Sequence, residues 1–130
     1  MIKILIIDDE RDIRNVLKKR LQKNYNCWID VASNVESGLE FCKRKKYDLI
    51  FFDYLFLDNT DGFNLLYSIK RKAEQCVTVM ISGYMKNAKE VEAKGYGVTP
   101  DEFIPKPFPD KAIEKVMDTY FPDQKLKKIL

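Results

Sequence analysis

Short apolar runs alternate with segments of helical periodicity along this chain of 130 residues. The strand-like runs cover residues 4–7, 27–31, 49–52, 77–81 and 103–104. Runs that are apolar throughout, such as residues 4–7 and 49–52, are typical of strands buried on both faces. Because a helical segment follows each run, the pattern predicts an α/β domain with a doubly wound parallel sheet between two layers of helices.

The helical segments carry their apolar residues on one side. The stripes are Ile13, Val16, Leu17 and Leu21 at about residues 10–23; Val35, Leu39 and Cys42; Phe63, Leu66 and Ile69; Ala88 and Val91 in a short polar helix at residues 86–94; and Ile113, Val116, Met117 and Tyr120. Ser33 and Glu36 form a capping-box pattern before the second helix, and Asp61 is a candidate N-cap of the third. Pro107 and Pro109 frame the start of the last helix.

Composition narrows the class of protein. Hydrophobic residues make up 45% and charged residues 33%, as in folded globular domains, and the net charge of +3 gives no reason to expect nucleic acid or a membrane as a partner. No stretch approaches the roughly 18 apolar residues that span a bilayer. The N-terminus turns acidic too early for a signal peptide, so we expect a cytoplasmic protein. We expect one domain at residues 1–121 and a frayed or lightly docked tail at 122–130.

The cysteines Cys27, Cys42 and Cys76 are widely spaced, and the sequence contains no histidine. Without a CxxC pair or a histidine, a zinc site is not expected. We interpret the three as reduced thiols that serve as small hydrophobic residues of the core.

Polar residues stand at the carboxyl ends of four predicted strands. Asp8 and Asp9 follow the first run, Asp53 follows the third, Ser82 the fourth and Lys106 the fifth. Ligands of open parallel α/β sheets bind beyond these strand ends. We therefore expect the five side chains to meet at one rim of the sheet.

The charges in this set indicate which ligand would bind. The three aspartates and Lys106 sum to about −2. Two like charges about 4 Å apart, at an effective dielectric constant of about 20, repel by about 4 kcal/mol, so the site is either partly protonated or ready for a cation. Oxygen ligands alone suit Mg²⁺. A carboxylate beside Mg²⁺ can attack a phosphoryl donor, and Lys106 and the Ser82 hydroxyl could then contact the phosphate of the resulting aspartyl phosphate.

The chain resembles the receiver, or response regulator, family of two-component signalling over nearly its whole length. The matching motifs are Ile6-Ile7-Asp8-Asp9-Glu10; Phe51-Phe52-Asp53 with Gly62 beyond; Met80-Ile81-Ser82-Gly83; and Phe103-Ile104-Pro105-Lys106-Pro107-Phe108. The resemblance implies a flavodoxin-like, three-layer fold with strand order 2-1-3-4-5. It points to a stand-alone, chemotaxis-regulator-like member of the family.

The resemblance also implies the roles of the residues at the rim. Asp53 would be phosphorylated by a histidine kinase or a phosphotransfer protein, with Lys106 pairing with the phosphate. Mg²⁺ would be held by Asp8, Asp9, Asp53 and the backbone carbonyl of Leu55. The protein would then be a signalling switch rather than an enzyme, because it catalyses only its own phosphoryl transfer and dephosphorylation.

Further residues match the family's switch and lifetime positions. Ser82 matches the switch hydroxyl and Phe103 the switch aromatic. Leu55 and Tyr84 stand two residues past Asp53 and Ser82, where they would flank the attacking water. Both are bulky and neither can orient water, so we expect slow hydrolysis of the phosphate. The resemblance leaves open the downstream protein target and the choice between a monomer and a phosphorylation-dependent dimer.

The sequence departs from the family pattern at several positions. Leu57 stands where proline is common, and the loop from Asp53 to Gly62 is one residue longer than usual. Gly83 follows the switch hydroxyl where alanine is commoner. The short polar helix at residues 86–94 lies in the family's output face, so an unusual partner surface is expected there.

Other interpretations fit fewer of these positions. Asp8 and Asp9 alone would pass for a helix cap with charge favoured by the helix dipole. A haloacid-dehalogenase-like phosphohydrolase needs a second aspartate two residues after its nucleophile, where Glu10 follows Asp8. An FMN-binding flavodoxin needs a glycine- and hydroxyl-rich phosphate loop, and the acidic run at residues 8–10 would repel that phosphate. A degenerate receiver that only binds partners would not need Asp53 and Lys106 intact.

Overall fold

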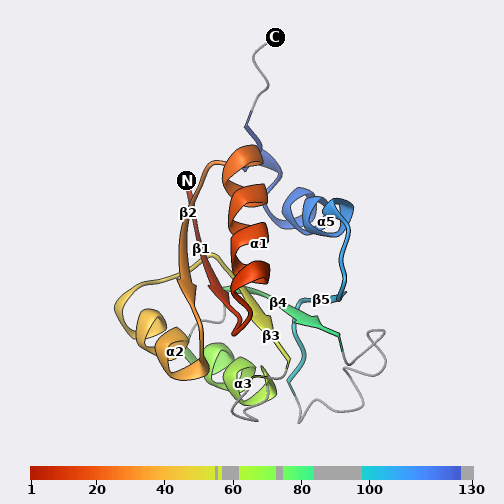
Figure 1. Cartoon of the computed structure of the whole chain (residues 1–130). Helices are drawn as coiled ribbons and strands as arrows, with labels where there is room; N and C mark the ends of the chain where they lie inside the picture. Colours follow the sequence, from red (N-terminus) through yellow and green to blue (C-terminus); the bar gives the residue numbers. More distant parts are fainter. Residues whose placement is uncertain (55, 57–61, 73–74, 84–97, 127–130) are drawn as a thin grey trace.

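A five-stranded parallel sheet forms the centre of the computed structural model, which describes residues 1–54, 56, 62–72, 75–83 and 98–126 (Figure 1). The strands are β1 (Ile2–Ile7), β2 (Cys27–Ala32), β3 (Leu49–Asp53), β4 (Val77–Ser82) and β5 (Glu102–Pro105). Their spatial order is β2-β1-β3-β4-β5. This confirms the predicted fold class and strand order.

Helices cover both faces of the sheet. They are α1 (Arg11–Asn24), α2 (Val35–Arg44), α3 (Gly62–Lys72) and α5 (Asp110–Tyr120), followed by the 3₁₀ helix η1 (Pro122–Gln124). Helices α1 and α5 pack on one face, and α2 and α3 pack on the other (Figure 1). The three-layer arrangement is therefore as predicted.

The central strands divide their side chains between two hydrophobic cores. In β3, Leu49 and Phe51 join the core under α1 and α5, whereas Ile50 and Phe52 join the core under α2 and α3. Every residue of β3 is buried. This two-sided burial explains why the strand is apolar up to Asp53.

Two local predictions are wrong. The N-cap of α2 is Asn34, not Ser33, because the helix begins one residue later and the Asn34 side chain accepts a hydrogen bond of 2.7 Å from the Ser37 backbone N–H. Val16 is 38% exposed, whereas the adjacent Leu17 is fully buried. The buried stripe of α1 is therefore narrower than predicted, because successive helical residues point about 100° apart.

Other predictions concern thiols and undescribed segments. The three cysteines are thiols rather than disulfides, as expected; Cys76 is buried, and Cys27 and Cys42 are half-buried. The Asp61 cap, the long loop with Leu57 and the helix at residues 86–94 lie outside the described residues.

The chain beyond α5 returns to the connection between α1 and β2, at residues 24–26. The Gln124 carbonyl accepts a hydrogen bond from the Asn26 N–H at 2.8 Å, and the Leu126 N–H donates to the Asn24 carbonyl at 2.8 Å. Lys125 forms an antiparallel bridge with Tyr25. The division into a domain at 1–121 and a tail stays a prediction, and these contacts describe how residues 122–126 lie against the connection between α1 and β2.

In the part of the chain that the structure describes, no helix has both the length and the apolar character of a membrane span. The cytoplasmic location stays a prediction.

Candidate functional site

The carboxyl ends of β1, β3, β4 and β5 meet at one rim of the sheet. Backbone hydrogen bonds continue just past the strands: the Tyr54 N–H donates to the Ile81 carbonyl at 3.0 Å, and the Lys106 N–H donates to the Ser82 carbonyl at 2.8 Å. These bonds hold Tyr54 after β3 and Lys106 after β5 in register with β4. The hydrogen bonding of the sheet thus continues to the residue beside Asp53 and to Lys106 itself.

Four acidic side chains gather at this rim. Carboxylate oxygens of Asp8, Asp9, Glu10 and Asp53 all lie within 4.8 Å of one another. Asp8 is 2% exposed and Asp53 is 5% exposed, so two of the four carboxylates are nearly removed from water. Such burial is costly unless the charges are compensated.

Lys106 supplies compensating charge from the end of β5. Its Nζ lies 3.2 Å from Asp8 Oδ2, 3.5 Å from Glu10 Oε1 and 3.5 Å from Asp53 Oδ1. The Lys106 side chain is only 12% exposed. One amine thus contacts three carboxylates, and four acids with one amine carry a charge of about −3 when all are ionised.

Local hydrogen bonds fix the orientation of Asp8. The Glu10 backbone N–H donates to Asp8 Oδ1 at 2.8 Å, and Arg14 Nη1 donates to the Asp8 carbonyl at 2.7 Å. Arg14 belongs to the first turn of α1, so the start of this helix is tied to the end of β1. The second Asp8 oxygen remains directed at Lys106.

The site shifts the pKa values of its ionisable groups. Burial, reinforced by the negative charge of Asp8, raises the pKa of Asp53 to about 6, although Lys106 opposes this. Burial also raises the pKa of Asp8, against the hydrogen bond from Glu10 and the charge of Lys106. Burial alone would lower the pKa of Lys106, but Asp8 and Asp53 raise it above its ordinary value, so the amine stays charged.

Gly62 lies directly against the backbone at the end of β3. Its N–H donates to the Tyr54 carbonyl. A Cβ at this position would stand 2.5 Å from the Asp53 carbonyl oxygen and 3.1 Å from Tyr54 Cα. Since both are backbone atoms that cannot turn aside, the close approach of α3 to Asp53 requires a glycine.

The acidic cluster fits a hard divalent cation. All four of its potential ligands are carboxylate oxygens, with neither a thiol nor an imidazole among them. This donor set is typical of Mg²⁺ or Ca²⁺ rather than of zinc. The excess negative charge of the cluster also favours a cation.

The structure brings together most of the residues singled out in the sequence. Asp8, Asp9, Asp53 and Lys106 form the cluster, and Ser82 is fully buried at the end of β4. Phe103 is half-buried in β5 and packs against the core under α2 and α3. Leu55 and Tyr84 lie outside the described residues, so the metal role of the Leu55 carbonyl and the lifetime role of both residues stay predictions.

Glu10 is the cluster member that the sequence analysis did not assign to the site. Its place directly after Asp8 and Asp9 was the available signal. Glu10 is the N-cap residue of α1, and its side chain could either bond the first N–H groups of the helix or point to the rim. The side chain makes no capping bond with any described residue, and it lies 3.5 Å from Lys106 Nζ.

Comparison with known proteins identifies the fold and its family. Residues 4–118 match the family model described as response regulator receiver domain. The chain is 32% identical over 111 residues to the transcriptional regulatory protein ResD of Bacillus subtilis, covering 85% of this chain and 44% of ResD. It is 31% identical over 109 residues to the response regulator ArlR of Staphylococcus saprophyticus, covering 83% and 47% of the two chains. The chain thus spans about half the length of the curated relatives it matches.

Solved structures agree with this match. A two-component response regulator from Clostridium difficile superimposes with a TM-score of 0.82 at 26% identity, covering 95% of this chain and 98% of that one. NtrX from Brucella abortus superimposes with a TM-score of 0.80 at 27% identity, covering 93% of this chain and 27% of NtrX. The family predicted from the four motifs is confirmed: the chain belongs to the receiver domains of two-component response regulators.

Proposed function

We propose that Asp53 is the phosphoacceptor of this domain and that a histidine kinase or a phosphotransfer protein supplies the phosphoryl group. The observation that carries this proposal is the contact between Lys106 Nζ and Asp53 Oδ1, at 3.5 Å, within a cluster of three further carboxylates. A buried carboxylate with an amine and oxygen ligands around it suits phosphoryl transfer to aspartate. In this role the domain is a signalling switch rather than an enzyme with a separate substrate.

Mg²⁺ is the proposed cofactor of the transfer. Asp8, Asp9 and Asp53 would hold it, and Glu10 belongs to the same cluster. When bound, Mg²⁺ would offset the negative charge between the carboxylates and the incoming phosphoryl group. The backbone carbonyl of Leu55, implied by the family resemblance as a further ligand, lies outside the described residues.

The proposed transfer forms a bond between a carboxylate oxygen of Asp53 and the phosphorus atom. The bond between phosphorus and the donor nitrogen of a phosphohistidine breaks, and its electron pair stays with that nitrogen. Lys106, already paired with Asp53, would bind one of the phosphate oxygens, and the Ser82 hydroxyl would bind another.

We further propose that phosphorylation changes a surface near β5. The phosphate would draw Ser82 inward, and Phe103 would fill the vacated space by a change of packing, since it has no hydroxyl. A protein partner would sense the new surface. A pull-down with phosphorylated and unphosphorylated chain would identify that partner, and Ser82→Ala should remove the difference between the two.

The direct test uses the purified chain, Mg²⁺ and acetyl phosphate. Intact mass should show one added phosphoryl group, stable in acid and labile in base, and EDTA should prevent its formation. Asp53→Asn is the matched control and should gain nothing. Continuous release of phosphate well beyond one equivalent would indicate a hydrolase instead, and an equally labelled Asp53→Asn variant would move the acceptor to another residue.

Thermal melts test the metal site independently of phosphorylation. Mg²⁺ that binds the folded cluster but not the unfolded chain should raise the melting temperature, because it adds about 1.4 kcal/mol to the free energy of unfolding at ten times the dissociation constant. Asp53→Asn should reduce this gain. An equal gain in both proteins would contradict a site that includes Asp53.

A further inference from the structure

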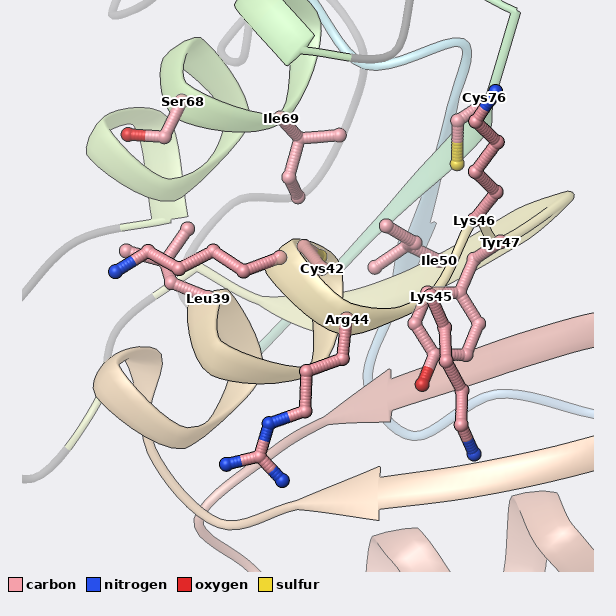
Figure 2. A pocket seen from close by; sticks show the side chains of 11 residues that line it. Leu39, Cys42, Arg44, Lys45, Lys46, Tyr47, Ile50, Ser68, Ile69 and Cys76 are labelled. Carbon is pink, nitrogen blue, oxygen red and sulfur yellow. The ribbon is translucent and has the colours of Figure 1, made fainter.

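A second concave site lies at the opposite end of the sheet from the acidic cluster. A cavity of about 280 Å³ opens between α2 and α3, beside the amino-terminal ends of β3 and β4 (Figure 2). Ligand pockets usually measure roughly 300–1,000 Å³, so this cavity is near the lower end of that range. Strand β3 borders the cavity with Ile50 and reaches the acidic rim with Asp53, so the two sites are separate.

The floor of the cavity is apolar and uncharged. Figure 2 shows Ile50 and Ile69 turned toward the same space as the thiol of Cys76, and all three residues are buried. Burial raises the pKa of Cys76 to about 12, so its sulfur stays a neutral thiol at neutral pH. The floor therefore offers contact to a hydrocarbon chain or ring without repelling an anion.

One wall of the cavity is held in place by Asp30. This carboxylate accepts a hydrogen bond of 2.6 Å from the Tyr47 hydroxyl and one of 3.1 Å from Lys45 Nζ. The Lys45 amine also lies 5.6 Å from the centre of the Trp28 ring, within cation–π distance. Tyr47 and Lys45 are thus ordered before any ligand arrives, which lowers the entropic cost of binding.

The mouth of the cavity carries more positive than negative charge. Four consecutive cations, at residues 43–46, line it. Among the described residues, these cations pair with two carboxylates: Lys43 and Arg44 share Glu40 at 3.4 and 3.6 Å, and Lys45 pairs with Asp30. Lys46 makes no ion pair with any described residue. Cations are favoured at the end of α2 by the helix dipole, but the dipole does not explain why they border a hollow apolar space.

We propose that this cavity binds a small carboxylate with an apolar body, such as an alkyl or aromatic acid. The body would lie against the floor between α2 and α3, and the carboxylate would meet the surplus cations at the mouth. The proposal does not depend on phosphorylation of Asp53.

Octanoate is a suitable probe for this site with the full chain. Ten non-hydrogen atoms at ordinary ligand efficiency correspond to a dissociation constant of about 6 mM, measurable by NMR titration of backbone amides. The amides that shift should belong to α2, α3 and residues 45–50. Octanol lacks the carboxylate and tests the contribution of the charge, whereas propionate tests the contribution of the long alkyl group. Both should bind several-fold more weakly than octanoate.

Two kinds of variant separate charge from shape. Lys46→Gln should weaken octanoate about threefold, the size of one exposed ion pair, and leave octanol unchanged. Cys42→Phe from α2 and Ser68→Phe from α3 should each fill the cavity and abolish binding of both probes. Lys111→Gln, on α5 across the sheet, is the charge-matched control and should have no effect.

Three results would overturn the proposal. Equal affinity for octanoate and octanol would mean a purely apolar crevice. Shifts confined to residues away from α2 and α3 would place binding elsewhere, and no shifts at about 60 mM, ten times the expected dissociation constant, would mean that the cavity takes no such ligand. The amide spectrum of each variant reports its folding, and having two filling variants keeps the test decisive if one is unfolded.

Discussion

Tyr25 and Tyr47 are both buried, but in the part of the chain that the structure describes, only the Tyr47 hydroxyl of the two is hydrogen-bonded. The Tyr47 hydroxyl donates to Asp30 at 2.6 Å, whereas the Tyr25 hydroxyl is buried with no hydrogen-bond partner among the described residues. A buried polar group without a partner costs about 1–3 kcal/mol, and a hydrogen bond to a charged group contributes about 1.5–3 kcal/mol.

Substitution by phenylalanine should therefore affect the two positions in opposite directions. Tyr25→Phe should leave the free energy of unfolding unchanged or raise it by up to about 1 kcal/mol, and Tyr47→Phe should lower it by about 2 kcal/mol. Urea denaturation of the two variants beside the wild type measures both values. A larger loss at Tyr25 than at Tyr47 would contradict the assignment.

Asp30 also predicts a dependence of stability on pH. Burial alone would raise its pKa, but hydrogen bonds from Tyr47, Lys45 and Trp28 outweigh burial and hold the pKa below the ordinary 3.8. A carboxyl group whose pKa is lowered by folding stabilises the protein at pH values above its pKa in the unfolded chain. This contribution disappears as the pH falls through the pKa of the folded state.

The wild type should therefore be more stable than Asp30→Asn at pH 7, and the difference should shrink below about pH 4. Urea midpoints of the two proteins between pH 7 and pH 3 provide the measurement. A difference that stays constant over this range would mean that the Asp30 charge does not stabilise the fold.

At the scale of elements, the close packing of α3 on the end of β3 gives a matched pair of glycine substitutions. At Gly62 a Cβ would meet the Asp53 carbonyl oxygen at 2.5 Å, whereas at Gly83 the nearest contact would be Lys106 Cβ at 3.9 Å. Gly62→Ala must push α3 away from β3 and should cost about 1–3 kcal/mol of stability.

Gly83→Ala should be tolerated, because 3.9 Å is an ordinary contact distance between carbon atoms. Thermal melts compare the stability of the two variants. Labelling by acetyl phosphate should be slower in Gly62→Ala, because the added methyl group displaces the backbone of Asp53. Equal melting temperatures for the two variants would show that α3 has room to move.

The elements also show which features a sequence can predict. The apolar run at residues 49–52 predicts a strand, because a strand buried on both faces is apolar throughout, whereas a surface helix is apolar on one side only. The observed strand extends one residue further, to Asp53. The cap of α2 could not be predicted in the same way. Ser33 and Asn34 are both good capping residues, and the choice depends on where β2 ends.

The sequence predicts those residues of the candidate site that stand at the carboxyl ends of strands. Asp8, Asp53 and Lys106 follow apolar runs, and parallel strands bring their ends to one rim. The contact of Glu10 with Lys106 and the hydrogen bond of Arg14 to the Asp8 carbonyl depend on the path of the chain from β1 into α1. The pattern of apolar and polar residues does not predict that path. The cavity between α2 and α3 depends on how two helices are spaced, and their apolar stripes do not encode that spacing.

At the scale of the whole molecule, residues 122–126 join the last helix to the connection between α1 and β2. Two backbone hydrogen bonds connect Gln124 and Leu126 to Asn26 and Asn24. Truncation after Phe121 removes both bonds and should lower the free energy of unfolding by about 1–3 kcal/mol.

Lys125→Ala keeps the backbone of this segment and should have a much smaller effect, so it separates the backbone bonds from one of the positive charges that truncation removes. Both variants should still accept phosphate from acetyl phosphate, because the segment lies at the end of the sheet away from Asp53. An unchanged stability after truncation would support a domain that ends at residue 121.

The amine of Lys106 contacts three of the four carboxylates of the acidic cluster. A cation entering between the carboxylates would repel this amine, whereas a phosphoryl group on Asp53 would attract it. The two arrivals therefore displace the same side chain in opposite senses. On the proposed function, the position of this ammonium group would therefore report whether a metal-loaded domain has also been phosphorylated.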